Sequence, residues 1–162
     1  MSSQLNYGFG NNGFGRVLVA WSERGVCALL PGEDEVTLAQ RFPRATLVAA
    51  PLHPWAQRAL RCMDAGSSLD VPLDLHGTAF QQQVWQALRE VPAGQTVSYA
   101  GLAARLKSPT AARAVARACA SNPLAVLVPC HRVVRSDGGL GGYRWGVQRK
   151  QQLLEAERHV SS

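Results

Sequence analysis

A cysteine and a histidine stand side by side at Cys130 and His131, in the stretch 128–134 that reads VPCHRVV. Apolar residues on both sides of the pair predict a short, tight connection between packed segments. A thiol becomes a nucleophile when it is deprotonated and accessible, and an adjacent imidazole can help to deprotonate it. The two residues alone fit a buried, inert cysteine beside a hydrogen-bonded histidine at least as well, because neighbours in sequence need not meet in space.

Motifs further along the chain favour the reactive interpretation. Pro-Cys-His-Arg-Val is followed by Ser136-Asp137-Gly138 and by Gly142-Tyr143. In this order the motifs resemble the active-site signature of the O6-alkylguanine-DNA alkyltransferases, also called methylated-DNA–protein-cysteine methyltransferases. Within that family the chain is most similar to the C-terminal methyltransferase portion of adaptive-response regulators of the Ada type. The resemblance is dense from about Pro72 to Glu157 and extends more weakly back to Arg16.

The resemblance implies a DNA repair protein that takes an alkyl group from O6-alkylguanine, mainly O6-methylguanine, with O4-methylthymine as a further candidate. Cys130 would be the nucleophile and methyl acceptor, and His131 would be its base, acting through a water. Glu157 would orient His131, Tyr143 would donate a hydrogen bond to the leaving oxygen, and Asn122 would order the site. The thioether product is not on the reversible part of the cysteine oxidation ladder, so one turnover per molecule is expected.

Two further residues, Val133 and Trp145, would shape the substrate pocket. Backbone groups of Cys130 and Val133 would recognise the guanine edge. Trp145 follows Tyr143 where many family members carry small residues, so we expect a narrowed pocket that favours methyl over benzyl-sized groups. The sequence indicates no metal and no cofactor, because its scattered cysteines and histidines form no recognisable ligand spacing.

Helical spacing also predicts the face on which Glu157 lies. Val147, Lys150, Leu154 and Glu157 are three or four residues apart and are therefore predicted to share one face of a final helix. A carboxylate on an apolar face needs a partner, although a frayed last turn would leave it in solvent. Glu155 is the competing candidate, but it lies off that face.

Short helices are predicted after residue 77. Thr78 and Gln81 form a capping box for the first helix. Ser98 is expected to cap a second helix and Thr110 a third, at 111–120. The second and third helices, joined by a tight turn, fit a helix-turn-helix, although any helical bundle contains such pairs.

Side chains of the third helix favour DNA binding without sequence preference. It is rich in alanine, and only Arg113 and Arg117 project from it, four residues apart. Few groups could read base edges in the major groove. The family resemblance implies double-stranded DNA bound through the minor groove, with Ala111 and Ala112 in close approach, Arg113 filling the gap left by a flipped nucleotide, and Tyr99 crowding its phosphate.

Charge is divided unevenly along the 162 residues. Residues 1–77 carry a net charge of −1 and residues 78–162 a net charge of +7. A basic half fits a polyanion such as nucleic acid, although a solvated basic face also keeps a protein soluble. Without a signal peptide or an apolar run of membrane-spanning length, we expect a cytoplasmic monomer with reduced thiols and no membrane partner.

The N-terminal half predicts a small α/β domain at 1–70, with ribonuclease-H-like shape implied by the resemblance. Residues 1–15 fit a mobile tail or a hairpin turn. The predicted elements are strands at 16–21 and 25–30 joined by a turn, a helix at 32–42, a strand at 45–49, a helix at 54–63, a linker at 65–68 and a strand at 71–75. Residues 71–162 would form a mostly helical, winged-helix-like domain for DNA binding and alkyl transfer.

Two other functions remain to be weighed. A helix-turn-helix protein could bind alkylated DNA without repairing it, but relatives of that kind typically replace the cysteine with tryptophan, and this chain retains Cys130. A Cys-His hydrolase would turn over and would need an oxyanion pocket, for which the sequence gives no support.

Overall fold

The computed structural model describes residues 4–65 and 71–158. The chain forms two compact units: the first contains the chain up to His76 together with Pro123–Leu127, and the second contains Gly77–Asn122 and the chain from Val128 onward. The units therefore divide after His76, whereas the sequence suggested 70–71, and the segment just before the cysteine belongs to the first unit. The separate roles expected for the two halves stay predictions.

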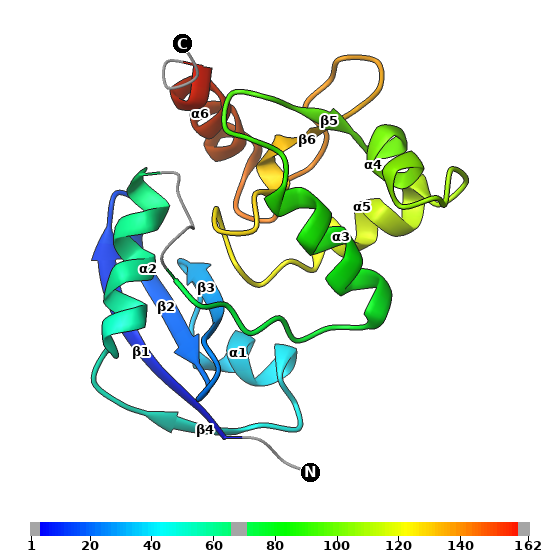
Figure 1. The fold of residues 1–162 in the computed structure, drawn as a ribbon. Helices are drawn as coiled ribbons and strands as arrows, with labels where there is room; N and C mark the ends of the chain where they lie inside the picture. The colour runs from blue at the N-terminus through cyan, green and yellow to red at the C-terminus, as the bar shows by residue number, and fades with distance from the viewer. Residues whose placement is uncertain (1–3, 66–70, 159–162) are drawn as a thin grey trace. The chain divides into compact units, whose positions relative to one another are not determined.

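A four-stranded sheet in the order β3-β2-β1-β4 forms the centre of the first unit (Figure 1). Three strands are antiparallel neighbours, and β4 runs parallel to β1. The strands are β1 (Gln4–Asn12), β2 (Gly15–Trp21), β3 (Val26–Pro31) and β4 (Thr46–Ala49). The predicted hairpin at 16–30 is confirmed. The expectation of a mobile tail is wrong from Gln4 onward, because these residues pair with β2 as the first arm of a second hairpin.

Helix α2 (Pro54–Ala65) packs against three strands of this sheet. Glycines in β1 allow the close approach: a Cβ added at Gly10 would meet the Leu60 side chain at 2.3 Å, and one at Gly8 would meet Leu52 at 3.1 Å. The shorter α1 (Glu35–Arg41) begins after Asp34, whose carboxylate accepts from two backbone amides. Both helices were predicted at nearly these positions.

The strand predicted at 71–75 is wrong. Only Leu73 forms an isolated bridge, with Val26. Asp74 instead accepts hydrogen bonds from the Ser22 hydroxyl at 2.6 Å and from His76 at 2.8 Å. The backbone still pairs with β3 at this one bridge, where the Val26 amide donates to the Pro72 carbonyl and the Asp74 amide donates to the Val26 carbonyl, both at 2.9 Å. The linker predicted at 65–68 lies mostly outside the described residues.

The second unit is mostly helical (Figure 1). Its elements are α3 (Ala79–Arg89), β5 (Val97–Ser98), α4 (Tyr99–Arg105), α5 (Ala112–Ala120), the 3-10 turn η1 (Cys130–Arg132), β6 (Val133–Val134) and α6 (Val147–Arg158). The capping box predicted for α3 is confirmed. Val84, Trp85 and Leu88 are buried on its inner face, and the Trp85 indole donates to the Ala118 carbonyl of α5 at 2.9 Å.

Helices α4 and α5 form the predicted helix-turn-helix pair and pack against each other. The cap predicted at Ser98 is confirmed by its hydrogen bond from the Gly101 amide at 2.8 Å. The cap predicted at Thr110 is wrong: α5 begins at Ala112, and its N-cap Ala111 offers no side-chain acceptor. The intervening turn is closed by the Ala111 amide donating to the Ser108 carbonyl, and Lys107 takes a positive φ of 58° there.

Within the described ranges 4–65 and 71–158, every helix is too short or too polar to cross a bilayer.

Candidate active site

The cysteine lies on the single turn of η1, directly before the two-residue strand β6. Cys130 opens the turn directly after Pro129, and Val133 at its end pairs in parallel with Val97. Because β5 leads straight into α4, this pairing fixes the cysteine turn beside the start of the helix-turn-helix. A two-residue ladder thus places Tyr99, the first residue of α4, near the thiol.

A cavity of about 350 Å³ opens beside Cys130 within the second unit. Its wall combines residues from α4, α5, η1 and the 141–144 loop. The lining residues are Tyr99, Ala116, Cys119, Ala120, Cys130, Gly142, Tyr143 and Arg144. Three predicted site residues, Tyr99, Cys130 and Tyr143, are therefore brought together. Cys119 and Arg144 also line the cavity, although spacing in the sequence gave no reason to assign them to it.

The thiol of Cys130 is 5% exposed and receives a hydrogen bond from Asn122. The Asn122 amide donates to the sulfur at 3.2 Å and to the Val128 carbonyl at 2.8 Å, which ties the end of α5 to the cysteine segment. Burial raises the pKa of Cys130 to about 11, against the opposing effects of this hydrogen bond and of the Lys150 charge. The resting form at neutral pH is therefore the thiol.

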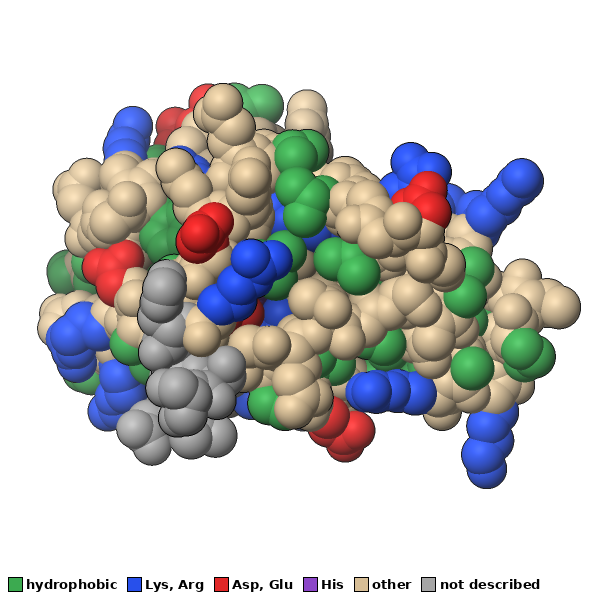
Figure 2. Space-filling view, turned by 90° about the horizontal axis from the view of Figure 1, so that it is seen from above, with side chains coloured by type: hydrophobic (Ala, Val, Ile, Leu, Met, Phe, Trp, Pro, Cys, Tyr) green, Lys and Arg blue, Asp and Glu red, His purple; other side chains and the backbone are tan. Residues whose placement is uncertain are grey.

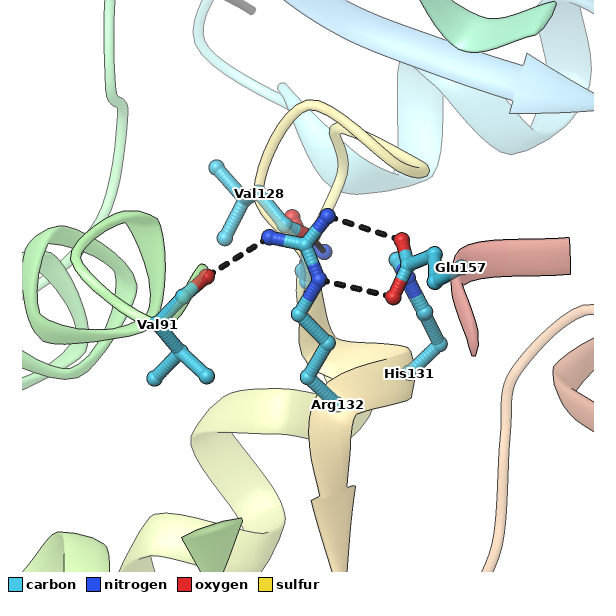
Figure 3. Close-up of polar contacts among 6 residues, drawn as sticks. Val91, Val128, His131, Arg132 and Glu157 are labelled. Atoms are coloured by element: carbon cyan, nitrogen blue, oxygen red, sulfur yellow. Dashed lines mark hydrogen bonds and ion pairs between the residues drawn. The ribbon is translucent and has the colours of Figure 1, made fainter. Parts of the chain in front are cut away.

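A buried polar cluster joins the cysteine turn to α6 (Figure 3). It consists of His131 and Arg132 from η1 and Glu157 from α6. The Arg132 guanidinium forks onto both Glu157 oxygens, at 3.0 and 2.7 Å, and also donates to the Val91 carbonyl at 2.7 Å. His131 Nε2 lies 2.8 Å from Glu157 Oε2. Arg132 thus forms a salt bridge with Glu157, and the same carboxylate also contacts His131.

Burial and contacts within this cluster determine the protonation states of Glu157 and His131. Burial alone would raise the pKa of Glu157, but hydrogen bonds from His131 and Arg132 and the charge of Arg132 lower it to about 2. Burial lowers the pKa of His131, with the Glu157 contact opposing this. His131 is thus a neutral imidazole beside an ionised carboxylate. Its Nδ1 and the Tyr143 hydroxyl are buried and have no hydrogen-bond partner among the described residues.

Helix α6 presents a polar face to the interior, which corrects the apolar face predicted for it. Val147 is 46% exposed, whereas Lys150 is fully buried and Glu157 is 6% exposed. The Lys150 ammonium donates to the carbonyls of Val133, Leu140 and Gly142. Lys150 therefore holds the cavity-lining loop against β6. The seven-residue spacing to Glu157 placed both on one face, but nothing in the sequence indicated three backbone partners.

Helix α5 carries its two arginines close to the alanines that line the cavity. Arg113 and Arg117 are exposed, and Ala111 and Ala112 are half-buried. Ala116 and Ala120 line the cavity. At helical spacing these alanines lie next to the arginine row. Figure 2 shows Lys and Arg side chains projecting from both the left and the right of the view.

Two predicted pocket residues are not among those lining the cavity. The Val133 side chain is buried, and its carbonyl is taken by Lys150. Trp145 packs edge to face against Tyr143, with ring centroids 5.4 Å apart. Any effect of Trp145 on the cavity would therefore pass through Tyr143.

The sequence and the fold match known proteins in the region that holds this site. Residues 79–159 match the family model described as 6-O-methylguanine DNA methyltransferase, DNA binding domain. The chain is also 41% identical over 126 residues to the inducible methylated-DNA–protein-cysteine methyltransferase of Bacillus subtilis, covering 76% of this chain and 70% of that protein. The chain belongs to the methylated-DNA–protein-cysteine methyltransferase family.

Other members extend the comparison. The bifunctional transcriptional activator/DNA repair enzyme Ada of Escherichia coli is 52% identical over 162 residues, covering 94% of this chain and 45% of that protein. The chain thus spans about half the length of this relative. The crystal structure of Mycobacterium tuberculosis O6-methylguanine methyltransferase superposes with a TM-score of 0.80 at 35% identity, covering 98% of this chain and 95% of that one. The mixed α/β fold is therefore that of the family.

Proposed function

We propose that this protein repairs DNA by moving the alkyl group of O6-alkylguanine, chiefly O6-methylguanine, onto Cys130. The observation that carries the proposal is the cavity in which a buried thiol, held by Asn122, shares a wall with Tyr143. Family membership supports the same chemistry. O4-methylthymine is a further candidate substrate.

The target base must leave the duplex, because its O6 substituent cannot otherwise reach an enclosed thiol. The Cys130 sulfur then attacks the alkyl carbon, forming an S–C bond as the O6–C bond breaks. The thiol proton passes through a water to the unpartnered Nδ1 of His131, and Glu157 stabilises the imidazolium that forms. The Tyr143 hydroxyl donates to the departing O6, where negative charge develops.

The raised pKa of Cys130 favours proton transfer during the reaction over a standing thiolate. A buried thiol is shielded from oxidants and from unrelated electrophiles. Burial lowers the pKa of His131, so its imidazole is unprotonated at neutral pH, and the contact with Glu157 opposes this effect and strengthens the imidazole as a proton acceptor. The site therefore fits a protein whose single reactive group must be kept for its substrate.

We further propose that α4 and α5 dock on double-stranded DNA through the minor groove, without reading sequence. Exposed Arg113 would fill the space of the extruded nucleotide, and Tyr99 would crowd its phosphate. Arg117 would contact the backbone, and half-buried Ala111 and Ala112 would permit close approach. Since the Lys and Arg side chains of the second unit greatly outnumber its acids, binding should weaken steeply with salt.

Finer features of the fold and setting are also proposals. The order β3-β2-β1-β4, with three antiparallel strands and a parallel fourth, supports a ribonuclease-H-like arrangement for the first unit. The helix-turn-helix, with β5 before it and β6 after it in the chain and these two strands paired in a small ladder, supports a winged-helix-like second unit. A monomer acting once, in the cytoplasm, completes the proposal.

The test is intact-protein mass after mixing with a duplex that carries one O6-methylguanine. We expect a gain of one methyl that saturates at one per molecule, is lost in Cys130→Ser and persists in Cys119→Ser, the other thiol of the cavity. Repair of a molar excess of DNA would refute the single turnover. Binding without any mass gain would instead favour a protein that recognises alkylated DNA and does not repair it.

A further inference from the structure

The tip of the first hairpin carries the chain's one Asn-Gly pair, at Asn12 and Gly13. Asn12 ends β1 and pairs with Gly15 at the start of β2, so Gly13 and Phe14 form the turn. An Asn-Gly pair is chemically labile in a flexible chain, because no side chain shields the glycine nitrogen from the asparagine amide carbon. The sequence therefore places a reactive pair at a turn, and the local structure sets how fast it reacts.

Hydrogen bonds hold both reacting groups of this pair. The Gly13 amide donates to both oxygens of the Asp64 carboxylate, at 3.0 and 3.2 Å. The Asn12 side-chain amide donates to the Leu60 carbonyl at 3.0 Å, and its oxygen accepts from the Phe14 amide at 2.8 Å. The attacking nitrogen and the carbon that it would attack are thus both tied to fixed partners, and two of those partners belong to α2.

Asp64 stands where the helix itself disfavours an acid. It lies in the last turn of α2, and a carboxylate near a helix C-terminus interacts unfavourably with the helix dipole. Its side chain is exposed, so it serves no packing role in the core. A Cβ added at Gly13 would lie 2.8 Å from its Oδ1. The glycine that makes the pair labile is therefore the residue that the Asp64 contact requires.

We propose that Asn12 is a deamidation site and that Asp64 holds its reaction rate down. In the first step the Gly13 nitrogen loses its proton and attacks the side-chain carbon of Asn12. Ammonia leaves, carrying away that proton, and a cyclic succinimide remains. Water then opens the ring to aspartate or isoaspartate, and it is the sole added reactant.

Asp64 slows the first step in two ways. The bidentate, charge-assisted contact holds the Gly13 N–H on the carboxylate, so this contact must break before the nitrogen can turn to the asparagine carbon. The carboxylate charge also disfavours the negative nitrogen that forms as the proton leaves, because like charges repel. The Leu60 contact adds to this by holding the Asn12 amide in place.

Deamidation at Asn12 would weaken the first unit. Either product replaces an amide that donates to the Leu60 carbonyl with a carboxylate that has no proton to donate. Isoaspartate also adds a main-chain carbon beside the β1–β2 pairing. Since the proposed function uses each molecule once, a copy must stay intact until it meets a lesion. The deamidation chemistry itself is independent of alkyl transfer.

The measurement is peptide mass mapping of the full chain during incubation at mildly alkaline pH, with aspartate and isoaspartate at Asn12 as the readout. Asp64→Ala should deamidate about tenfold faster than wild type, the effect of losing a charge-assisted hydrogen bond. Asp64→Asn keeps an acceptor without the charge, so its rate should fall between the two.

The matched control is Asp34→Ala. Asp34 also accepts from two backbone amides of the first unit, but it caps α1. Its replacement removes the same charge and a comparable contact while leaving the hairpin tip intact, so the rate at Asn12 should stay that of wild type. In urea the folded contacts are absent, and all four proteins should deamidate at one common, higher rate.

Equal folded rates in wild type and Asp64→Ala would overturn the proposal. An equal acceleration in Asp34→Ala would do so too, since the effect would then come from general loss of stability. A difference between the variants that persists in urea, or modification at Asn11 in place of Asn12, would also overturn it.

Discussion

Replacing Glu157 with glutamine tests the buried cluster that backs the cysteine. A carboxyl group whose pKa falls from 4.5 to about 2 is stabilised in its charged form by about 3 kcal/mol on folding. Glu157→Gln removes that charge and leaves Arg132 buried without its counter-ion, a change that typically costs about 3–5 kcal/mol. We therefore expect the free energy of unfolding of the second unit to fall by about 3 kcal/mol at pH 7, lowering its Tm by about 12–24 °C.

The stabilisation by Glu157 is expected to decrease as the pH falls. Because the folded-state pKa is depressed, the stabilisation is complete above the unfolded value of 4.5 and is lost as pH falls from there toward 2. The glutamine variant lacks this titration. The stability gap between wild type and variant should therefore shrink by about 2 kcal/mol between pH 7 and pH 3.

Urea unfolding at pH 7 and at pH 3 measures the difference in the free energy of unfolding between wild type and variant. Hydrogen exchange of the α6 and η1 amides then shows whether the loss is local to the cluster. The matched control is Glu155→Gln on the same helix, an exposed residue whose replacement should change stability by less than about 0.5 kcal/mol. A Glu157→Gln variant as stable as the control at pH 7, or a gap that stays constant with pH, would refute the account of the cluster.

Further predictions concern the thiol and the lysine anchor. Because burial raises the pKa of Cys130 to about 11, the rate of its alkylation by a small neutral reagent should keep rising up to about pH 11. Peptide mass mapping measures this rate at Cys130, and a rate that levels off near pH 9 would contradict the prediction. Asn122→Ala removes the donor to the sulfur, so methyl transfer at pH 8 should slow by about tenfold, and an unchanged rate would remove Asn122 from the site. Lys150→Met leaves three carbonyls without their ammonium donor, so the free energy of unfolding should fall by about 2 kcal/mol. Amide hydrogen exchange should rise first around Gly142. An equal rise throughout the second unit would contradict the role of Lys150 in holding this loop.

Local sequence signals predicted much of the framework. The capping pair Thr78 and Gln81 was enough to place the start of α3, because capping depends on near neighbours. Where a local signal competed with other contacts, it failed. Thr110 was expected to cap α5, but a backbone hydrogen bond from Ala111 to Ser108 closes the turn instead.

The sequence by itself determined the reactive pair, the order of the motifs and the basic character of the second half, since these depend only on residue identity and spacing. The tertiary structure decided what those residues contact. Glu157 lies 26 positions beyond His131, and only the docking of α6 lets one carboxylate serve both His131 and Arg132. The same docking buries Lys150 against three carbonyls. Such contacts depend on long-range packing, in which a charge is buried only if distant partners satisfy it, and no local pattern encodes where those partners will lie.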